Sequence, residues 1–205
     1  MPTANSRRAK QLPLAIRTWG GARRNAGRKP NGDKAGVAHL PRTELRRRLP
    51  LHVTLRMAPR VYNLRSRRSF RVIDRAMRRG ANRFDVAVIR FSVQGNHIHL
   101  LVEAADRESL ARAMKGLSVR IARGMNRLMG TSGRVIGDRY HSRVLLTPSE
   151  VRNVVHYLSN NHRRHVGGFP EEWIDPLTVE SGVAARTWLL RVGWRSRATD
   201  KRQNC

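Results

Sequence analysis

Two apolar stretches joined by one short turn constrain the fold of this chain more than any other feature. The first runs from about Asp85 to Val93, the second from His97 to Glu103, and Gly95-Asn96 lies between them. Glycine and asparagine tolerate the positive φ angles that tight turns often need. The two stretches therefore predict a β-hairpin, and a period of two predicts that one face of its first strand carries Ala87, Ile89, Phe91 and Val93.

Two more strands are expected outside this hairpin. Between residues 51 and 57, apolar residues alternate with His52, Thr54 and Arg56, which is the pattern of a half-buried strand. A further strand is expected at about residues 139–146. With the hairpin, these segments give a sheet of four strands.

Three helices are expected between and after the strands. Apolar residues at helical spacing predict one helix over residues 66–80 and a second from 106 to 130. The third has a start signal in Thr147-Pro148-Ser149-Glu150, which offers an N-cap threonine, a proline at the first helical position and a glutamate three residues after the cap. It is expected to run to about His165, before Gly167-Gly168.

The order of these elements predicts the fold class. Strand, helix, strand, strand, helix, strand is the order of a ferredoxin-like α+β sandwich, with an antiparallel sheet and helices on one face. The third helix is added after this unit. We therefore expect a central domain over residues 49–168, a flexible basic arm over 1–48, and a basic extension with several tryptophans over 169–205.

Both extensions leave alternatives open. In the arm, Gly27-Arg28-Lys29-Pro30 resembles the core of an AT-hook, although a plain solvated tail also fits this composition. In the C-terminal extension, apolar residues and three tryptophans favour a small folded cap, and tryptophan next to arginine also suits stacking on unpaired bases. The tryptophans are Trp173, Trp188 and Trp194.

The charge of the chain restricts its partners. Its 205 residues include 42 lysines and arginines against 14 acidic residues, a formal net charge of +28. Such an excess argues against a metabolic enzyme with a balanced surface and predicts a polyanionic partner. Arginine supplies nearly all of the positive charge, and its guanidinium binds phosphates and guanine edges at two points, so nucleic acid is favoured over a lipid surface.

Cysteine content and hydropathy indicate the compartment. The sole cysteine is Cys205, which excludes a disulfide framework within the chain and a metal site made of cysteines. Apolar runs are far shorter than the roughly 20 residues that span a bilayer, and residues 1–30 contain no signal-peptide core. A protein of the reducing cytosol, without membrane insertion, is expected.

Four residues form a candidate site for phosphate chemistry. His97 and His99 stand two apart on a predicted strand, so both imidazoles project from one face and offer two ligands to a metal ion. Tyr157 and Asn161 stand four apart on the third helix and share one of its faces. A tyrosine hydroxyl, with a pKa near 10, is a poor nucleophile unless a cation polarises its target, and a divalent metal on the histidines would supply that cation.

Other tyrosines and histidines are weaker candidates. Tyr140, in Asp138-Arg139-Tyr140-His141, is a rival nucleophile, but packing or stacking also explains it, and Tyr62 lacks a suitable partner in sequence. Asp138 neutralises Arg139 or supports the site indirectly. Three further histidines are expected at the surface or on phosphates: His156, His162 and His165.

Three motifs together resemble a known family, the Y1 transposases of the IS200 type, and within it the REP-associated tyrosine transposases. They are the segment from Gly95 to Val102, then Asp138-Arg139-Tyr140-His141-Ser142, and then the segment from Val155 to Asn161. The resemblance covers about residues 50–167. It departs from the REP-associated branch at His162, where that branch commonly has a proline.

The resemblance implies a histidine-hydrophobe-histidine endonuclease that cuts single-stranded DNA beside a hairpin. The cut leaves a 5′-phosphotyrosine bond and a free 3′-hydroxyl, and the reverse step rejoins strands. Residue by residue, it assigns His97 and His99 to the metal, Tyr157 to the nucleophile and Asn161 to a third metal ligand. Members of the family use Mg²⁺ or Mn²⁺.

Two other functions fit the sequence less well. A non-catalytic protein that binds DNA hairpins or RNA would have the same charge, but its binding would not depend on Tyr157. A two-metal nuclease built on carboxylates is disfavoured because the few acidic residues show no converging spacing. The sequence leaves open whether the chain forms a homodimer, and whether Tyr157 acts on the site of its own chain.

Overall fold

The computed structural model describes residues 44–166, 168–170 and 173–195. Most of the expected arm, residues 1–43, lies outside the described residues, as do residues 196–205 of the expected C-terminal extension. Within the described ranges, each helix is too short or too polar to span a lipid bilayer.

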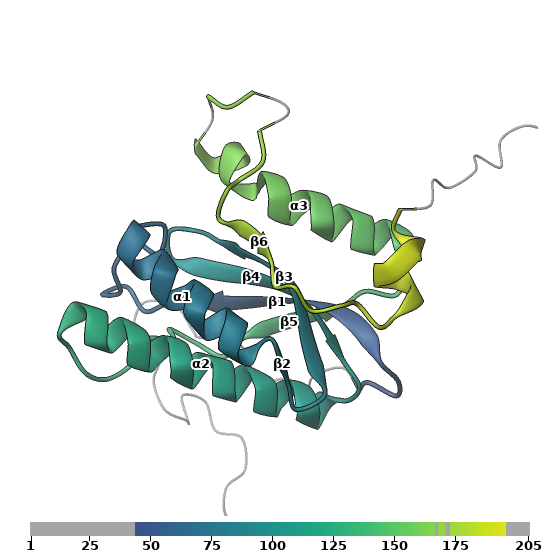
Figure 1. Cartoon of the computed structure of the whole chain (residues 1–205), viewed down its shortest axis with the longest axis horizontal. Helices are drawn as coiled ribbons and strands as arrows, with labels where there is room; N and C mark the ends of the chain where they lie inside the picture. The colour runs from purple at the N-terminus through teal and green to yellow at the C-terminus, as the bar shows by residue number, and fades with distance from the viewer. Residues whose placement is uncertain (1–43, 167, 171–172, 196–205) are drawn as a thin grey trace, which may run out of the picture. The chain divides into compact units, whose positions relative to one another are not determined.

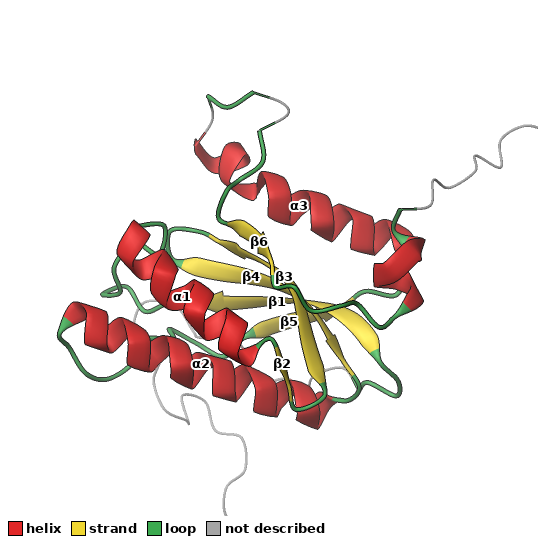
Figure 2. Ribbon diagram, viewed as in Figure 1, coloured by secondary structure: helices red, strands yellow, loops and turns green. Residues whose placement is uncertain are grey.

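An antiparallel sheet of six strands forms the centre of the fold (Figure 2). Its order is β2-β3-β4-β1-β5, with β6 paired to β3. The strands are β1 (Leu49–Arg56), β2 (Asn82–Arg83), β3 (Val86–Val93), β4 (His97–Ala104), β5 (His141–Val144) and β6 (Thr178–Glu180). The four expected strands are β1, β3, β4 and β5, and β5 lies beside β1 as in a ferredoxin-like sheet, so the predicted fold class is confirmed.

Helices cover both faces of this sheet (Figure 1). The helices α1 (Arg67–Gly80) and α2 (Arg107–Met129) pack on one face. On the other face lie α3 (Pro148–Val166) and the short π-helix η1 (Leu189–Gly193). The expected pair of helices on one face is therefore present, and the added third helix covers the opposite face.

Local capping signals explain where the helices begin. Ser66 accepts a hydrogen bond from the Ser69 amide at the start of α1, and Asp106 does the same for Ser109 at the start of α2. At α3, Thr147 Oγ1 accepts from the Glu150 amide at 3.2 Å, while the Glu150 carboxylate accepts from the Thr147 amide at 3.2 Å. The expected capping box is thus formed.

Burial divides the apolar residues into two clusters. The main cluster lies between the sheet and α1 and α2, and its largest side chains include Phe91, Ile98 and Leu100. The second cluster lies between the sheet, α3 and η1, and consists of Leu101, Leu145, Val151, Val155, Leu158 and Leu190. Leu100 and Leu101 are neighbours on β4 and belong to different clusters because successive strand residues point to opposite faces.

A β-bulge in β3 makes one sequence expectation wrong. Val88 pairs with Val102 and Arg90 with Leu101, so Ile89 is an extra residue in the ladder. Because of this extra residue, even-numbered residues face the main cluster before the bulge and odd-numbered residues face it after the bulge. The main cluster therefore contains Val86, Val88, Phe91 and Val93, whereas Ile89 packs against the second cluster, and the predicted single face of Ala87, Ile89, Phe91 and Val93 does not exist.

Turn geometry also differs from expectation. The predicted hairpin turn is present, because the Gln94 amide donates to the His97 carbonyl at 2.9 Å, but neither Gly95 nor Asn96 has a positive φ. Left-handed backbone occurs instead at Phe84 (φ 56°) and Asp85 (φ 57°), in the two-residue turn between β2 and β3. Two consecutive left-handed residues are what a type I′ hairpin requires.

The described part of the C-terminal extension contacts both clusters: Leu177, Val179 and Val183 pack against the main cluster, and residues from Ala185 to Trp194 pack on the α3 side. Residues 178–180 form β6, and Trp194 packs against the second cluster and donates its indole N–H to the Leu190 carbonyl at 3.0 Å. Trp173 stacks on Phe169 with ring centroids 4.1 Å apart. Trp188 is 60% exposed. Trp194 therefore packs in a folded cap as expected, whereas Trp188 does not.

Candidate functional site

The predicted histidine pair, His97 and His99, lies on the α3 face of β4. Their rings are 4.7 Å apart between centroids, while Ile98 and Leu100 point into the main cluster on the opposite face. His97 is half-buried, and its Nδ1 lies 2.8 Å from Asn96 Oδ1. His99 is only 5% exposed and lies against Tyr157 of α3, so this histidine is covered rather than displayed on an open strand face.

Two residues of β1, which the sequence analysis did not assign to the site, hold His99. Thr54 is paired opposite His99 in the β1–β4 ladder. Its Oγ1 lies 3.2 Å from His99 Nδ1, and His52 Nε2 lies 3.0 Å from the same nitrogen. In the sequence, His52 and Thr54 are visible only as the polar residues that alternate with apolar ones in β1. Their place beside the histidine pair follows from the pairing of β1 with β4, which the sequence does not show.

Burial sets the charge state of His52. Burial, the largest cause, lowers the pKa of His52 to about 4, and repulsion from His141 and Arg143 lowers it further. His52 is therefore neutral near pH 7, and its Nε2 can accept a hydrogen bond from the Nδ1–H of His99. That arrangement leaves the lone pair of His99 on Nε2, the nitrogen that faces α3.

Tyr157 approaches the histidine pair from α3. Its hydroxyl lies 3.4 Å from His99 Nε2, and the two rings are 5.1 Å apart in an edge-to-face arrangement. Val155 and Leu158 hold this part of α3 on the second cluster. The structure therefore brings Tyr157 and the histidine pair together, although they are about 60 residues apart in the chain.

Asn161 lies one helical turn beyond Tyr157 and is 1% exposed. Neither its Oδ1 nor its Nδ2 has a hydrogen-bond partner among the described residues. A buried amide without partners costs about 1–3 kcal/mol, so it indicates a ligand that the described residues do not supply. Imidazoles and a side-chain carbonyl are a donor set that suits a divalent cation.

Histidine, cysteine and acidic residues alone do not complete a metal site. In the described part of the chain, no three of them form a group that could hold a metal ion. A metal on the histidine pair would therefore need a further ligand such as Asn161, together with oxygen atoms of water or substrate.

An open cavity adjoins the Tyr157 side of α3. Its volume is about 480 Å³, and its lining includes His52, Tyr157 and His156. Arg143 also lines it and pairs with Glu150 at 2.8 Å. The cavity thus places a neutral histidine, a phenol and a guanidinium around one space, which is a suitable environment for a phosphate group.

The remaining candidates lie elsewhere. Tyr140 is partly buried against the main cluster, and Tyr62 is 56% exposed. Asp138 accepts a hydrogen bond from the Arg139 amide at 2.7 Å. His162 lies near Phe169 and Trp173, and the side chain of His165 is outside the described part of the structure.

Comparison with known proteins gives one family and several similar structures. The model of the family described as "Transposase IS200 like" matches residues 47–161. A REP-associated tyrosine transposase bound to a REP hairpin is 11% identical with a TM-score of 0.54, over 69% of this chain and 82% of that one. The comparison with curated proteins found no match.

Two other solved structures have lower scores. A candidate transposase from Deinococcus radiodurans R1 is 16% identical with a TM-score of 0.41, over 62% of this chain and 96% of that one. A bacterial tRNA(His) guanylyltransferase-like protein in complex with ATP is 14% identical with a TM-score of 0.41, over 61% and 64%. At these identities the similarities concern the fold, and only the first structure scores high enough to support it.

Proposed function

We propose, because this chain belongs to the family of IS200-like transposases, that it is a metal-dependent endonuclease and strand transferase that acts on single-stranded DNA beside hairpins. The observation that carries this proposal is the Tyr157 hydroxyl, 3.4 Å from Nε2 of His99. A nucleophile and a metal-binding nitrogen at this separation can act on the same phosphate.

Each residue of the site has a role in the proposed reaction. The Tyr157 oxygen forms a bond to phosphorus while the bond from phosphorus to the 3′ oxygen breaks. The tyrosine loses its hydroxyl proton, and the departing oxygen takes up a proton to become a 3′-hydroxyl. His52 and Thr54 orient His99 through its Nδ1, and Arg143 contributes positive charge beside the phosphate.

The histidine pair and Asn161 would hold a divalent cation, Mg²⁺ or Mn²⁺. The buried, unpartnered amide of Asn161 supports this donor set. Such a cation, when bound, supplies positive charge to the phosphate oxygens and makes phosphorus a better target for a phenol. Removal of metal with a chelator should therefore stop cleavage and leave most DNA affinity, because arginines supply most of the attraction to phosphate.

Two observations support hairpin DNA as the partner. The relative with a TM-score of 0.54 was solved with a REP hairpin. The net charge of +28 favours a polyanion. On this proposal, the basic arm over residues 1–48 adds phosphate contacts, the domain over 49–168 carries the chemistry, and the extension over 169–205 supports the catalytic helix.

The decisive experiment compares two tyrosine variants. Full-length protein is incubated with single-stranded hairpin DNA and Mn²⁺, and a covalent protein–DNA band is sought on a denaturing gel. Tyr157→Phe keeps the ring but removes the hydroxyl, so it should form no adduct. Tyr140→Phe is the matched control and should form the adduct at the rate of the unmodified protein.

Other outcomes of this experiment contradict the proposal. An adduct that persists in Tyr157→Phe, or that peptide mass mapping places on Tyr140, would overturn the assignment of the nucleophile. Tight hairpin binding without any adduct from the unmodified protein would support the non-catalytic binding function instead.

Salt dependence tests the role of the arm. Deletion of residues 1–40 should weaken DNA binding, because the arm's basic side chains can no longer neutralise phosphates. For a single strand, the slope of log affinity against log salt should fall by about 0.7 for every phosphate that the arm would otherwise bind. The same slope in the truncated protein would mean that the arm does not touch phosphate.

A further inference from the structure

The segment that follows α3 returns to the sheet, and one of its residues, Asp175, is fully buried there. We use the name strap for its described residues 173–180, which end in β6 at the edge of the sheet (Figure 1). We infer that the strap positions the nucleophile: it fixes α3 at the two residues that follow Tyr157 and so commits this tyrosine to the histidine pair of its own chain. The inference rests on the function proposed above.

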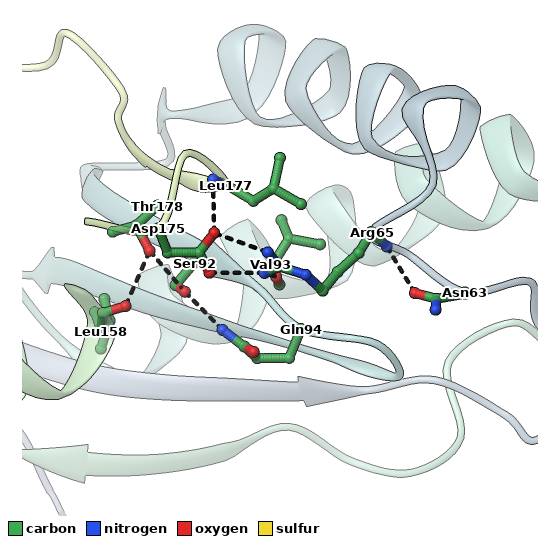
Figure 3. A network of polar contacts seen from close by, with 9 residues as sticks. All are labelled: Asn63, Arg65, Ser92, Val93, Gln94, Leu158, Asp175, Leu177 and Thr178. Carbon is green, nitrogen blue, oxygen red and sulfur yellow. Dashed lines mark hydrogen bonds and ion pairs between the residues drawn. The ribbon is translucent and has the colours of Figure 1, made fainter. Parts of the chain in front are cut away.

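A buried ion pair anchors the strap to the segment that precedes α1. Asp175 is fully buried, and its two carboxylate oxygens accept hydrogen bonds from Arg65 at 2.7 and 2.9 Å (Figure 3). The same guanidinium donates to the Val93 carbonyl at 2.9 Å, and the Leu177 amide donates to Asp175 at 3.0 Å. This two-point geometry fixes direction as well as distance.

From this anchor the strap reaches α3 through Thr178. Thr178 Oγ1 lies 2.9 Å from the Leu158 carbonyl on α3 and 2.9 Å from Ser92 Oγ on β3 (Figure 3). Gln94 donates to the same Ser92 oxygen at 3.0 Å. Ser92 is paired opposite His99 in the sheet, so the contact lies at the level of the histidine pair.

A second polar contact joins the strap to the next residue of α3. Arg90 on β3 donates to Ser159 Oγ at 3.2 Å and pairs with Glu180 of β6 at 2.5 Å. The Asp175 amide also donates to the Ser159 carbonyl at 3.5 Å. Leu158 and Ser159 are therefore both tied to the strap, and they lie between Tyr157 and Asn161 on the helix.

These ties matter because the apolar support of α3 is small. Its buried apolar contacts to the sheet come from Val151, Val155 and Leu158. A helix with so few buried contacts can shift or lift without exposing much apolar surface. Misplacement of a reacting group by about 1 Å can cost on the order of 10²-fold in rate, so a device that fixes Tyr157 has a direct catalytic effect.

The test uses two strap variants and one matched control. Thr178→Val removes the hydroxyl with little change of shape, and Asp175→Asn removes the charge from the buried pair. Asp74→Asn breaks a more exposed arginine–aspartate pair within α1, away from α3, and is the control for the loss of an aspartate charge. The rate of adduct formation is measured at saturating hairpin DNA with Mn²⁺, alongside the DNA dissociation constant and amide hydrogen exchange.

Both strap variants should slow adduct formation by about 10- to 100-fold at saturating DNA, with little change in DNA affinity. Hydrogen exchange should rise in the peptide of α3 and stay unchanged in α1 and α2. Asp74→Asn should match the unmodified protein. An unchanged rate in Thr178→Val, or exchange that rises equally in every helix, would overturn the positioning role.

A mixture of two inactive chains tests the commitment to one chain. Tyr157→Phe lacks the nucleophile, and His99→Ala lacks one histidine of the pair. We expect no adduct when they are mixed, because the strap of the His99→Ala chain keeps its intact Tyr157 at its own incomplete histidine pair. An adduct in the mixture would overturn the inference. Absence of adduct from the unmodified protein would instead refute the proposed function, so the two failures are distinguishable.

Discussion

On the α1 and α2 side of the sheet, 25 buried apolar residues form one cluster, whereas on the α3 side the buried cluster has six among the described residues. The α3 side relies on polar contacts instead. Glu103, fully buried, accepts hydrogen bonds from the Arg186 and Thr187 amides at 2.7 Å each, and Asp175 accepts from Arg65. Apolar packing supplies stability without direction, whereas hydrogen bonds fix direction, so one face stabilises the fold and the other orients a site.

The largest expected difference between the faces comes from two adjacent leucines of β4. Leu100 and Leu101 are 0% and 1% exposed and point to opposite faces. Leu100→Ala should lower the free energy of unfolding by about 5 kcal/mol, because the main cluster is rigid and keeps the cavity. Leu101→Ala should cost only about 2–3 kcal/mol, because far fewer buried apolar side chains surround it. Urea denaturation of both variants measures the two values.

Activity should respond in the opposite way. At temperatures where both variants are folded, Leu101→Ala should slow adduct formation more than Leu100→Ala, because only Leu101 lies under α3, which carries the proposed nucleophile. Equal losses of stability together with equal losses of activity would mean that the two faces are not functionally distinct.

The second largest expected effect is a loss of unfolding free energy on acidification, which arises on the α3 side of the sheet. The pKa of His52 is about 4 in the folded protein and near 6.5 in an unfolded chain, so the unfolded state binds the proton more readily between these values. Stability contributed by neutral His52 is complete above about pH 6.5 and is lost as the pH falls towards 4, by up to about 3 kcal/mol. Urea midpoints of metal-free protein from pH 7.5 to 4 measure this loss.

The variant His52→Gln keeps a polar group but cannot take up this proton, and it serves as the control. Its unfolding free energy should fall less over the same pH range. A pH profile identical to that of the unmodified protein would show that the loss of stability arises elsewhere.

The smallest expected effect concerns two glycines of α2. A Cβ at Gly124 would lie 2.5 Å from Val72 Cγ1 on α1, whereas a Cβ at Gly116 would meet only the flexible end of Arg120 at 3.2 Å and Phe84 at 3.5 Å. Gly124→Ala should cost about 1–2 kcal/mol, since the clash exceeds the gain in helix propensity. Gly116→Ala should be neutral or stabilise by up to about 1 kcal/mol. Thermal melting of both variants measures the two changes in stability. A lower melting temperature for Gly124→Ala than for Gly116→Ala would show that α1 and α2 are tightly packed at Gly124.

Features encoded locally could be predicted from the sequence. The capping box at Thr147, the left-handed Gly130 that ends α2 and the alternation in β1 each depend on a few adjacent residues. The spacing of His97 and His99 on a strand, and of Tyr157 on a helix, was equally local. Their meeting at one site followed from the fold class and the family resemblance.

Features that depend on register could not be predicted. The bulge at Ile89 appears only when β3 is paired with β4, and His52 becomes a neighbour of His99 only when β1 is paired with β4. The left-handed turn uses Phe84, a residue type that gives no turn signal. Asp175 resembles any surface acid in sequence, because its burial depends on Arg65, 110 residues away.

The order of the two clusters along the chain has a consequence for synthesis. Every buried member of the main cluster comes from residues 45–135, whereas the second cluster requires residues as late as Leu190. Since a chain emerges from the ribosome from its N-terminus, the main face can form while α3 and the strap are still being made. Tyr157 and Asn161, both on α3, are the last members of the proposed site to be secured. On the proposed function, a nascent chain should therefore be unable to form the covalent bond to DNA until translation is nearly complete.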